Sequence, residues 1–384
     1  MKELLSHGAK WIGVAGTIAV LAVVTGCGSS DDEASSGGAG TTSAQAGGAL
    51  EKARTDAEKY TAPVTDWNAW APPEAPKPKA GQNVHIITCT WLLPECKAAA
   101  DDMGEAAQTI GWRPKLVDGT PDVAKQRQAL QTAIEQRADG IIVDALDPQP
   151  LADLLQKASD QKIPVLMQAG VNIARYGGVD GAVPPSLGPE AEALAAWVAD
   201  KSGGKAKVFM VEAANNEAND DRAKAFTGYL ESFPGVEIVG SMKVPFSKVG
   251  PPLQQQITSM LQGKPKGSID YIYAPFDGFA VWVVNALRSA GRDEIGVISF
   301  EANEQNTTFV AKGEYQVADA ARSWAWCSWT SVDELNRAMN EEPFAGGKCP
   351  YMVFTKENVG KWAGKRWQTE VDFREEFKSL WGVS

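Results

Sequence analysis

The stretch ADGIIVDALDP, residues 138–148, contains a complete passage from a strand to a helix. Gly140–Ala145 is a short, mostly apolar run, which is typical of a strand buried on both faces of a parallel sheet. Asp147-Pro148 then places a helix-capping residue before a proline at the first helical position. The stretch therefore predicts a strand, a short loop and a helix in direct succession.

The same alternation continues along most of the chain. Each short apolar run is followed by a helical stretch of about 12 to 18 residues. The further strands expected are Val84–Thr90, Ile163–Met167, Lys207–Val211, Ile269–Ala274 and Gly296–Phe300. Strands that alternate with helices of this length predict an α/β fold with parallel sheets covered on both faces. The length of 384 residues favours two lobes over one large sheet.

The composition disfavours several classes of function. A net charge of −11 argues against nucleic acid as a partner, because phosphate binding needs a basic surface. Only two histidines are present, and His7 lies in the expected leader. His85 lies inside an apolar strand run, so histidine-based triads and multi-histidine metal sites are disfavoured. We expect no catalytic residues, no metal and no cofactor.

The N-terminus has the three zones of a secretory signal peptide. Lys2 and Lys10 supply the positive start, Trp11–Val24 supplies the apolar middle, and two small residues precede Cys27. A cysteine at this place resembles the lipobox of bacterial lipoproteins. The resemblance implies that residues 1–26 are removed and that Cys27 is lipidated. The protein is then expected outside the cytoplasm, anchored to the bacterial cell membrane.

Residues 27–80 are expected to form the lipid anchor and a flexible, proline-rich tether. Residues 28–48 are small and polar, and such a composition cannot bury enough surface to fold. Residues 49–60 have the spacing of a short helix, and residues 63–78 are rich in proline, which is typical of an extended spacer. The folded body is expected to begin near Gln82.

Four cysteines remain once the lipobox cysteine is set aside, an even number that suits disulfides in an oxidising compartment. Three pairings are possible for four cysteines, and local closure favours Cys89 with Cys96 and Cys327 with Cys349. The alternative is a metal site, which the absence of any C-x-x-C spacing disfavours.

Unusual residues gather where the expected strands end. The segments are Thr88–Pro94, Gln168–Asn172, Glu212–Arg222, Phe276-Asp277 and Glu301–Asn303. In open parallel sheets, ligands bind beyond the carboxyl ends of the strands. We therefore expect the functional site at these ends.

Several local motifs, taken in order, resemble one known family. They are Ala138–Val143, Gln161–Val165, Arg222–Phe226 and Gly296–Phe300. From about residue 82 to 345 the chain resembles a periplasmic binding protein of the ribose-binding type, the extracytoplasmic solute receptor of an ABC importer. The resemblance implies the type I fold, in which two Rossmann-like lobes with parallel sheets are joined by three hinge crossovers and close on a ligand.

The resemblance also places the lobes. The N-terminal lobe is expected to comprise residues 81–183 and 322–348, and the C-terminal lobe residues 184–321 and 349–384. The three crossovers are expected near Ala182–Pro185, Ala321–Ser323 and Lys348–Pro350.

The same resemblance implies a ligand pocket. Arg222 matches an arginine that hydrogen-bonds sugar hydroxyls, and Glu301 stands where the family usually has an aspartate. Phe246 matches an aromatic side chain that packs on the sugar ring, and Trp91 lies in a loop where aromatic rings stack. Asp277 lies in a turn where family members show Asn-Asp.

Two features depart from the sugar binders of the family. Phe276 precedes Asp277 in place of a polar residue, and Ala169-Gly170 replace the usual Asp-Arg, with Gln168 beside them. Trp324 is expected near the hinge, facing the cleft. These departures leave the ligand open between a sugar and a flatter aromatic acid or nucleoside.

Two of the pocket residues also have an alternative structural role. The alternative for Asp277 is to cap the helix that follows it. The alternative for Arg222 is a solvated surface cluster with Asp220 and Asp221.

The sequence therefore predicts a binding protein and not an enzyme. We expect a monomeric lipoprotein that captures a sugar or a similar small molecule and delivers it to an ABC permease and its ATPase, with lobe closure as the functional motion. One alternative is a ligand receptor for a chemotaxis or sensor-kinase system. The other is a glycosidase that uses Asp277 and Glu301 as its carboxylate pair.

Overall fold

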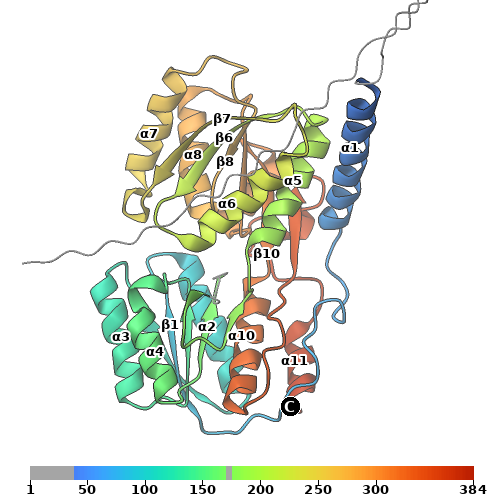
Figure 1. Ribbon diagram of the computed structural model, residues 1–384. Coiled ribbons are helices and arrows are strands. Elements are labelled where there is room, and N and C mark those ends of the chain that lie inside the picture. Colours follow the sequence, from blue (N-terminus) through green and yellow to red (C-terminus); the bar gives the residue numbers. More distant parts are fainter. Residues whose placement is uncertain (1–38, 170–174) are drawn as a thin grey trace, which may run out of the picture. The chain divides into compact units, whose positions relative to one another are not determined.

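The computed structural model describes residues 39–169 and 175–384. Cys27 and the expected leader lie outside the described residues, as does Gly170. Among the helices of the described part, none is long and apolar enough to span a bilayer. The described residues contain two α/β lobes, each built on its own sheet (Figure 1).

The N-terminal lobe is built on a five-stranded parallel sheet with the order β2-β1-β3-β4-β5. Its strands are β1 (Asn83–Thr88), β2 (Arg113–Asp118), β3 (Gly140–Asp144), β4 (Val165–Gln168) and β5 (Gly181–Val183). Every residue of β3 is buried, as its apolar run predicts. The helices of this lobe are α2 (Pro94–Thr109), α3 (Val123–Glu135), η1 (Gln149–Leu151), α4 (Ala152–Asp160) and α10 (Trp324–Met339).

The C-terminal lobe is built on a six-stranded sheet with the order β11-β10-β9-β8-β6-β7. Its strands are β6 (Lys207–Ala213), β7 (Glu237–Val244), β8 (Tyr271–Tyr273), β9 (Gly296–Phe300), β10 (Gln316–Arg322) and β11 (Tyr351–Thr355). Its helices are α5 (Gly188–Ser202), α6 (Glu217–Leu230), η3 (Phe246–Lys248), α7 (Pro251–Gln262), α8 (Asp277–Ala290) and α9 (Glu304–Lys312). The all-parallel prediction is wrong only at β11, which pairs antiparallel with β10. Since Tyr351 lies opposite Arg322, the chain re-enters the sheet where β10 ends and must run back along it.

The chain passes between the two sheets at three places. It leaves the N-terminal lobe after Val183, returns after Arg322, and leaves again before Tyr351. These places agree with the three crossovers that the family resemblance implies.

The two disulfides join the pairs of cysteines that local closure favours. Cys89 in the loop after β1 is bonded to Cys96 in α2, with their Cα atoms 5.4 Å apart. Cys327 in α10 is bonded to Cys349 before β11, with their Cα atoms 5.2 Å apart. The first bridge therefore fixes the loop at the end of β1 against the start of α2.

The C-terminal segment divides between the lobes, so its assignment to the C-terminal lobe over residues 349–384 is only partly right. β11 joins the C-terminal sheet, but α11 (Phe373–Trp381) packs into the core of the N-terminal lobe. Its buried residues Phe373, Phe377 and Trp381 recur every four residues, which places them on one face of the helix. That face covers Trp326 and Trp329 of α10, which are fully buried.

The N-terminal segment does not behave as a free tether over its described length. Helix α1 spans Ala39–Thr61 and is longer than predicted. Helix α1 lies beside α5 (Figure 1). Its residues Ala53 and Ala57 are buried in the core of the C-terminal lobe. The hydroxyl of Tyr229 in α6 donates to the carboxylate of Asp56 at 2.9 Å. The folded body therefore begins within α1 and not near Gln82.

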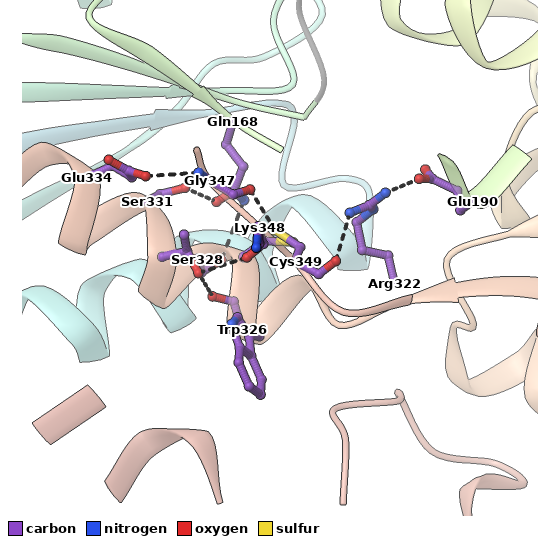
Figure 2. The surroundings of a disulfide bond; sticks show 12 residues. Gln168, Glu190, Arg322, Trp326, Ser328, Ser331, Glu334, Gly347, Lys348 and Cys349 are labelled. Carbon is purple, nitrogen blue, oxygen red and sulfur yellow. Dashed lines mark hydrogen bonds and ion pairs between the residues drawn. A yellow bond between two sulfur atoms is a disulfide. The ribbon is translucent and has the colours of Figure 1, made fainter. Parts of the chain in front are cut away.

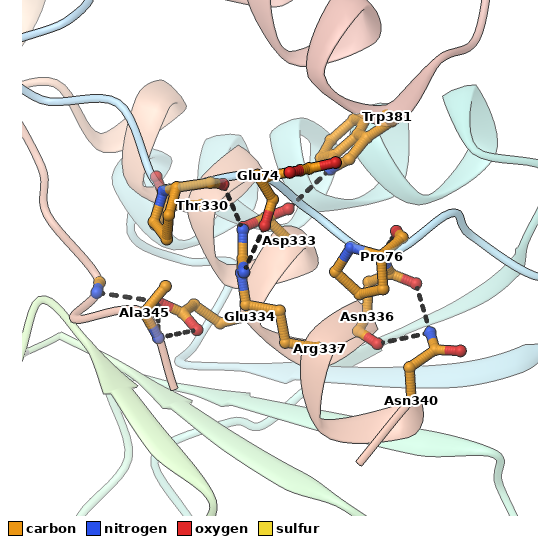
Figure 3. Close-up of polar contacts among 12 residues, drawn as sticks. Glu74, Pro76, Thr330, Asp333, Glu334, Asn336, Arg337, Asn340, Ala345 and Trp381 are labelled. Carbon is orange, nitrogen blue, oxygen red and sulfur yellow. Dashed lines mark hydrogen bonds and ion pairs between the residues drawn. The ribbon is translucent and has the colours of Figure 1, made fainter. Parts of the chain in front are cut away.

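Residues 62–80, here called the N-terminal strap, continue from α1 onto the N-terminal lobe. The Trp67 ring lies 4.9 Å from the ring of Trp326 and 5.0 Å from that of Phe377. Buried Arg337 of α10 donates to the carbonyl oxygens of Glu74 at 3.0 Å and Pro73 at 2.7 Å (Figure 3). Proline lacks an N–H but keeps its carbonyl acceptor, so a proline-rich segment can satisfy a buried arginine.

We expect Trp67→Ala to lower the free energy of unfolding by about 2 kcal/mol, because the indole is partly buried between two aromatic rings of the core. Urea unfolding of the full chain measures this change. Trp67→Phe, which keeps an aromatic ring, should lower the free energy of unfolding by less than half as much as Trp67→Ala. A change within about 0.5 kcal/mol for the alanine variant would show that the strap is solvated after all.

Candidate functional site

The N-terminal lobe contributes buried polar groups at the ends of β3 and β4. Asp144 ends β3 with 3% of its surface exposed, and Gln168 ends β4 fully buried. The Gln168 amide donates to the Asp144 carboxylate at 3.1 Å and accepts from the Ser331 hydroxyl of α10 at 2.7 Å (Figure 2). Helix α10 therefore fixes the orientation of Gln168, and Gln168 in turn orients Asp144.

Asp144 is a site residue that the sequence analysis missed, since it lies inside the apolar run of β3. Burial raises the pKa of its carboxyl to about 7, against the opposing effects of the Gln168 amide and the charge of Arg366. A carboxyl of this kind exchanges readily between an acceptor and a donor of hydrogen bonds near neutral pH.

The C-terminal lobe contributes Arg222 from the second turn of α6. Its guanidinium is 1% exposed, donates to the Pro275 carbonyl at 2.6 Å and to Glu190 at 3.2 Å, and lies over the Phe300 ring. Within the described part of the chain, the Nε of Arg222 has no hydrogen-bond partner. The surface alternative is therefore wrong. The neighbouring aspartates instead pair with lysines, Asp220 with Lys243 and Asp221 with Lys224.

Glu301 follows β9 with a positive φ of 105°, a backbone conformation that bulky residues adopt only under local constraint. Its Oε2 atom is buried and lacks a hydrogen-bond partner among the described residues. Burial raises the pKa of Glu301 to about 8, and the negative charges of Glu95, Asp319 and Asp144 add to this shift, whereas the positive charge of Arg222 opposes it.

Glu95 reaches the site from the other lobe and was also missed. It lies in the first turn of α2, beside the disulfide-bonded Cys96. Its Oε1 lies 3.7 Å from the point that a Cβ atom on Gly278 of α8 would occupy. Burial raises the pKa of the Glu95 carboxyl. The only sequence signal was an acidic residue in a first helical turn, which is common in ordinary helices.

Asp277 has a different position from the one expected. Its carboxylate is fully buried, accepts from the Ser299 hydroxyl at 2.6 Å and the Asn303 N–H at 2.7 Å, and hydrogen-bonds to Asp319. Burial and the negative charge of Asp319 raise the pKa of Asp277 well above its usual range. Phe276, not Asp277, occupies the position that caps α8. Asp277 therefore holds the loop that carries Glu301 and belongs to the support of the site.

The predicted aromatic residues form two groups. Phe246 in η3 is 41% exposed and stacks on Phe276 with ring centroids 5.5 Å apart. The Trp91 indole donates to the Thr88 hydroxyl at 2.8 Å, and its ring lies under the ammonium of Lys97. The structure therefore couples Phe246 with Phe276 on the C-terminal lobe and holds Trp91 against its own strand on the other lobe.

Trp324 begins α10, directly after the second crossover. Its ring lies beside the guanidinium of Arg322, whose central carbon is 5.9 Å from the ring centroid. Arg322 is buried, pairs with Glu190, and donates to the Cys349 carbonyl at 3.3 Å (Figure 2). Burial lowers the pKa of Arg322 to about 9. Trp324 therefore lies beside the second crossover, next to the ion pair of Arg322 with Glu190, and its expected role in facing the cleft stays a prediction.

Comparison with known proteins agrees with this architecture. Residues 94–338 match the periplasmic binding protein domain family. The ribose import binding protein RbsB of Bacillus subtilis (strain 168) is 24% identical over 236 residues, which cover 61% of this chain and 74% of that protein. A D-apiose import binding protein of Actinobacillus succinogenes is 22% identical over 243 residues, which cover 63% of this chain and 77% of that protein.

Solved structures show the same fold. An ABC transporter solute-binding protein from Bacillus halodurans C-125 with bound myo-inositol has a TM-score of 0.65 at 21% identity, covering 74% of this chain and 98% of that chain. An ABC transporter solute-binding protein from Mycobacterium smegmatis with bound glycerol has a TM-score of 0.68 at 17% identity. The match covers 76% of this chain and 100% of that chain. The predicted type I fold is therefore confirmed. Because the family match spans well over half of the 384 residues, this chain belongs to the periplasmic binding protein family, whose members are extracytoplasmic substrate-binding proteins of transport systems.

Proposed function

We propose that this protein is the solute-binding component of an ABC importer and that it captures a sugar or sugar-like polyol between its two lobes. The observation that carries the proposal is the approach of Glu95 on α2 to Gly278 on α8, which brings polar groups of both lobes to one place. These groups lie at the carboxyl ends of the strands, where open parallel sheets bind ligands. The import proteins for ribose and D-apiose among the relatives support the same ligand class.

The chemistry of the site suits a ligand with many hydroxyl groups. A hydroxyl both donates and accepts, so it can bond to a carboxylate on one side and a guanidinium or amide on the other. Arg222, Gln168, Asp144 and Glu301 supply these partners within the described residues. An aromatic acid fits less well, because its carboxylate would enter a site that already holds several acidic groups.

The contacts of the carboxyl groups also agree better with a binding role than with glycosidase activity. The two oxygens of Asp277 are engaged by Ser299 and Asn303, so this carboxyl is occupied in supporting a loop. A glycosidase would need both carboxyls of the pair free to reach the glycosidic bond. We therefore infer transport without chemical change of the solute, and delivery to a permease driven by an ATPase.

We expect a sugar or polyol of the right class to raise the melting temperature of the purified full chain by several degrees. A ligand at about a hundred times its Kd adds about 2.7 kcal/mol to the free energy of unfolding. A thermal-shift panel of pentoses, hexoses, polyols, nucleosides and aromatic acids measures this. Arg222→Ala should abolish the ligand-induced shift, whereas Lys224→Ala, which removes an exposed cation from the same helix, should keep it. Shifts with aromatic acids or nucleosides alone would contradict the ligand class, and no shift with any compound would contradict the function.

The raised pKa of Glu301 predicts a pH-dependent stability for the ligand-free protein. The folded state retains a proton that the unfolded chain releases between pH 4.5 and about 8, so the free energy of unfolding falls as pH rises through this window. One such group contributes at most about 1.4 kcal/mol per pH unit. Urea unfolding across this pH range should show that the free energy of unfolding falls less steeply with pH for Glu301→Gln than for the wild type. The same slope in both proteins would show that Glu301 is not responsible, and exposed Glu135→Gln serves as the control.

Lipid anchoring through Cys27 is part of the proposal. In the native host, Cys27→Ser should release the protein from the membrane fraction, because the acceptor thiol is lost. Fractionation followed by immunoblotting measures the distribution, with Cys89→Ser as a control that keeps the lipobox. Retention of the Cys27→Ser protein in the membrane fraction would rule out lipidation as the anchor.

A further inference from the structure

Two residues of the N-terminal lobe hold one carboxylate of the C-terminal lobe. The Tyr176 hydroxyl donates to Oε2 of Glu217 at 2.7 Å, and the Arg175 guanidinium forms an ion pair with Oε1 of the same side chain. Arg175 and Tyr176 lie between β4 and β5, whereas Glu217 is the first residue of α6. Both oxygens of the Glu217 carboxylate therefore accept from the opposite lobe.

The donor side of this contact is fixed to its own lobe. The Tyr176 ring packs against the apolar core that includes Leu155 of α4. A Cβ atom on Gly178 would lie 2.2 Å from the carbonyl oxygen of Leu155. One on Gly177 would lie 2.5 Å from Oε1 of Gln156. The backbone after Tyr176 therefore lies directly on α4, an approach that glycine permits, and Tyr176 moves with the N-terminal lobe.

The acceptor side is fixed by the start of α6. Asn216 caps this helix, and its side chain accepts from the Asn219 N–H at 2.9 Å. The cap sets the position of the first helical residue, Glu217. The same helix carries Arg222 of the candidate site. The interlobe contact and the site arginine therefore share one rigid element.

The contact depends on closure of the lobes. Rotation of the lobes about their crossovers would carry Tyr176 away from Glu217. Hydrogen bonds to an ionised carboxylate are stronger than bonds between neutral groups. The Glu217 side chain is 18% exposed and that of Arg175 is 59% exposed. Because an exposed ion pair contributes little, we assign the larger share of the contact to Tyr176.

We propose that Arg175, Tyr176 and Glu217 form a latch that stabilises the closed form and slows the release of the bound solute. The latch sets how long the solute is held and not which solute is chosen. The step from closure to solute release rests on the proposed function, whereas the effect on closure does not. A contact present only in the closed form shifts the equilibrium toward that form.

The first test measures the distance between the lobes in the solute-free full chain by double electron–electron resonance. Spin labels are attached at Lys125→Cys of α3 and Gln255→Cys of α7, which are exposed positions, in a Cys27→Ser background. In Tyr176→Phe we expect the ratio of closed to open molecules to fall about fivefold, because one hydrogen bond to a charged acceptor is lost. Glu217→Ala, which removes both acceptor oxygens, should lower the ratio at least as much.

The matched control is Tyr229→Phe. Tyr229 also belongs to α6, and its hydroxyl also donates to a carboxylate, that of Asp56 at 2.9 Å. This bond joins α6 to α1, which packs into the core of the C-terminal lobe, so it lies within one lobe. We expect the control to keep the ratio of closed to open molecules.

The second test measures the binding kinetics of D-ribose, D-apiose and myo-inositol by stopped-flow tryptophan fluorescence. For each probe that binds, the dissociation rate constant should be about fivefold higher in Tyr176→Phe than in the wild type. The association rate constant should change by less than about twofold, because the solute enters the open form and the latch forms afterwards. A purely structural role of Tyr176 would not separate the two rate constants in this way.

The outcomes separate the latch from the proposed function. The latch would be overturned by an unchanged ratio of closed to open molecules in either latch variant, by a wild type without a detectable closed population, or by an equal fall in Tyr229→Phe. An unchanged dissociation rate constant would overturn it as well. Each of these results would leave solute binding standing. A fall in the closed fraction without binding of any sugar or polyol would contradict the proposed function and leave the latch standing as a contact that favours closure.

Discussion

The shared carboxylate of Glu190 is the interaction that joins the site arginine to the crossovers between the two sheets. It is fully buried in the first turn of α5, just after the first crossover. One oxygen accepts from Arg222 in the site, and the other from Arg322 at the second crossover, which also donates to the Cys349 carbonyl at the third. The loss of one partner of a buried ion pair typically costs about 3–5 kcal/mol. A single side chain thus links the site arginine to the three crossovers between the two sheets.

The same low-polarity surroundings govern the acidic groups. Asp277 and Asp319 share a hydrogen bond and support the loop that carries Glu301, whereas Glu95 approaches α8 from the other lobe. Burial raises the pKa of each of these carboxyls. The protonation of these carboxyls therefore depends on their burial and on one another's charge.

The candidate site was only partly predictable from sequence. Arg222, Gln168 and Glu301 were found because they follow apolar strands, and the structure places each at a strand end or helix start beside the other polar groups. Asp144 ends an apolar run, and Glu95 lies in an ordinary first helical turn. Neither was therefore recognised as a site residue from the sequence. Only the approach of α2 to α8 brings Glu95 to the candidate site.

From apolar runs the sequence predicted the strands that correspond to β1, β3, β4, β6, β8 and β9, because their pattern is local, whereas β2, β5, β7, β10 and β11 were not among the strands expected. The three crossovers were implied by the family resemblance, and local closure favoured the two disulfides, whose cysteines are 7 and 22 residues apart. The tertiary structure alone decided where the N-terminal strap and α11 lie. The Arg337 bond to Glu74 joins residues 263 positions apart, and no local pattern encodes such a partner. A proline-rich composition indicates that a segment cannot fold alone. It does not exclude that another part of the protein packs against the segment and buries it.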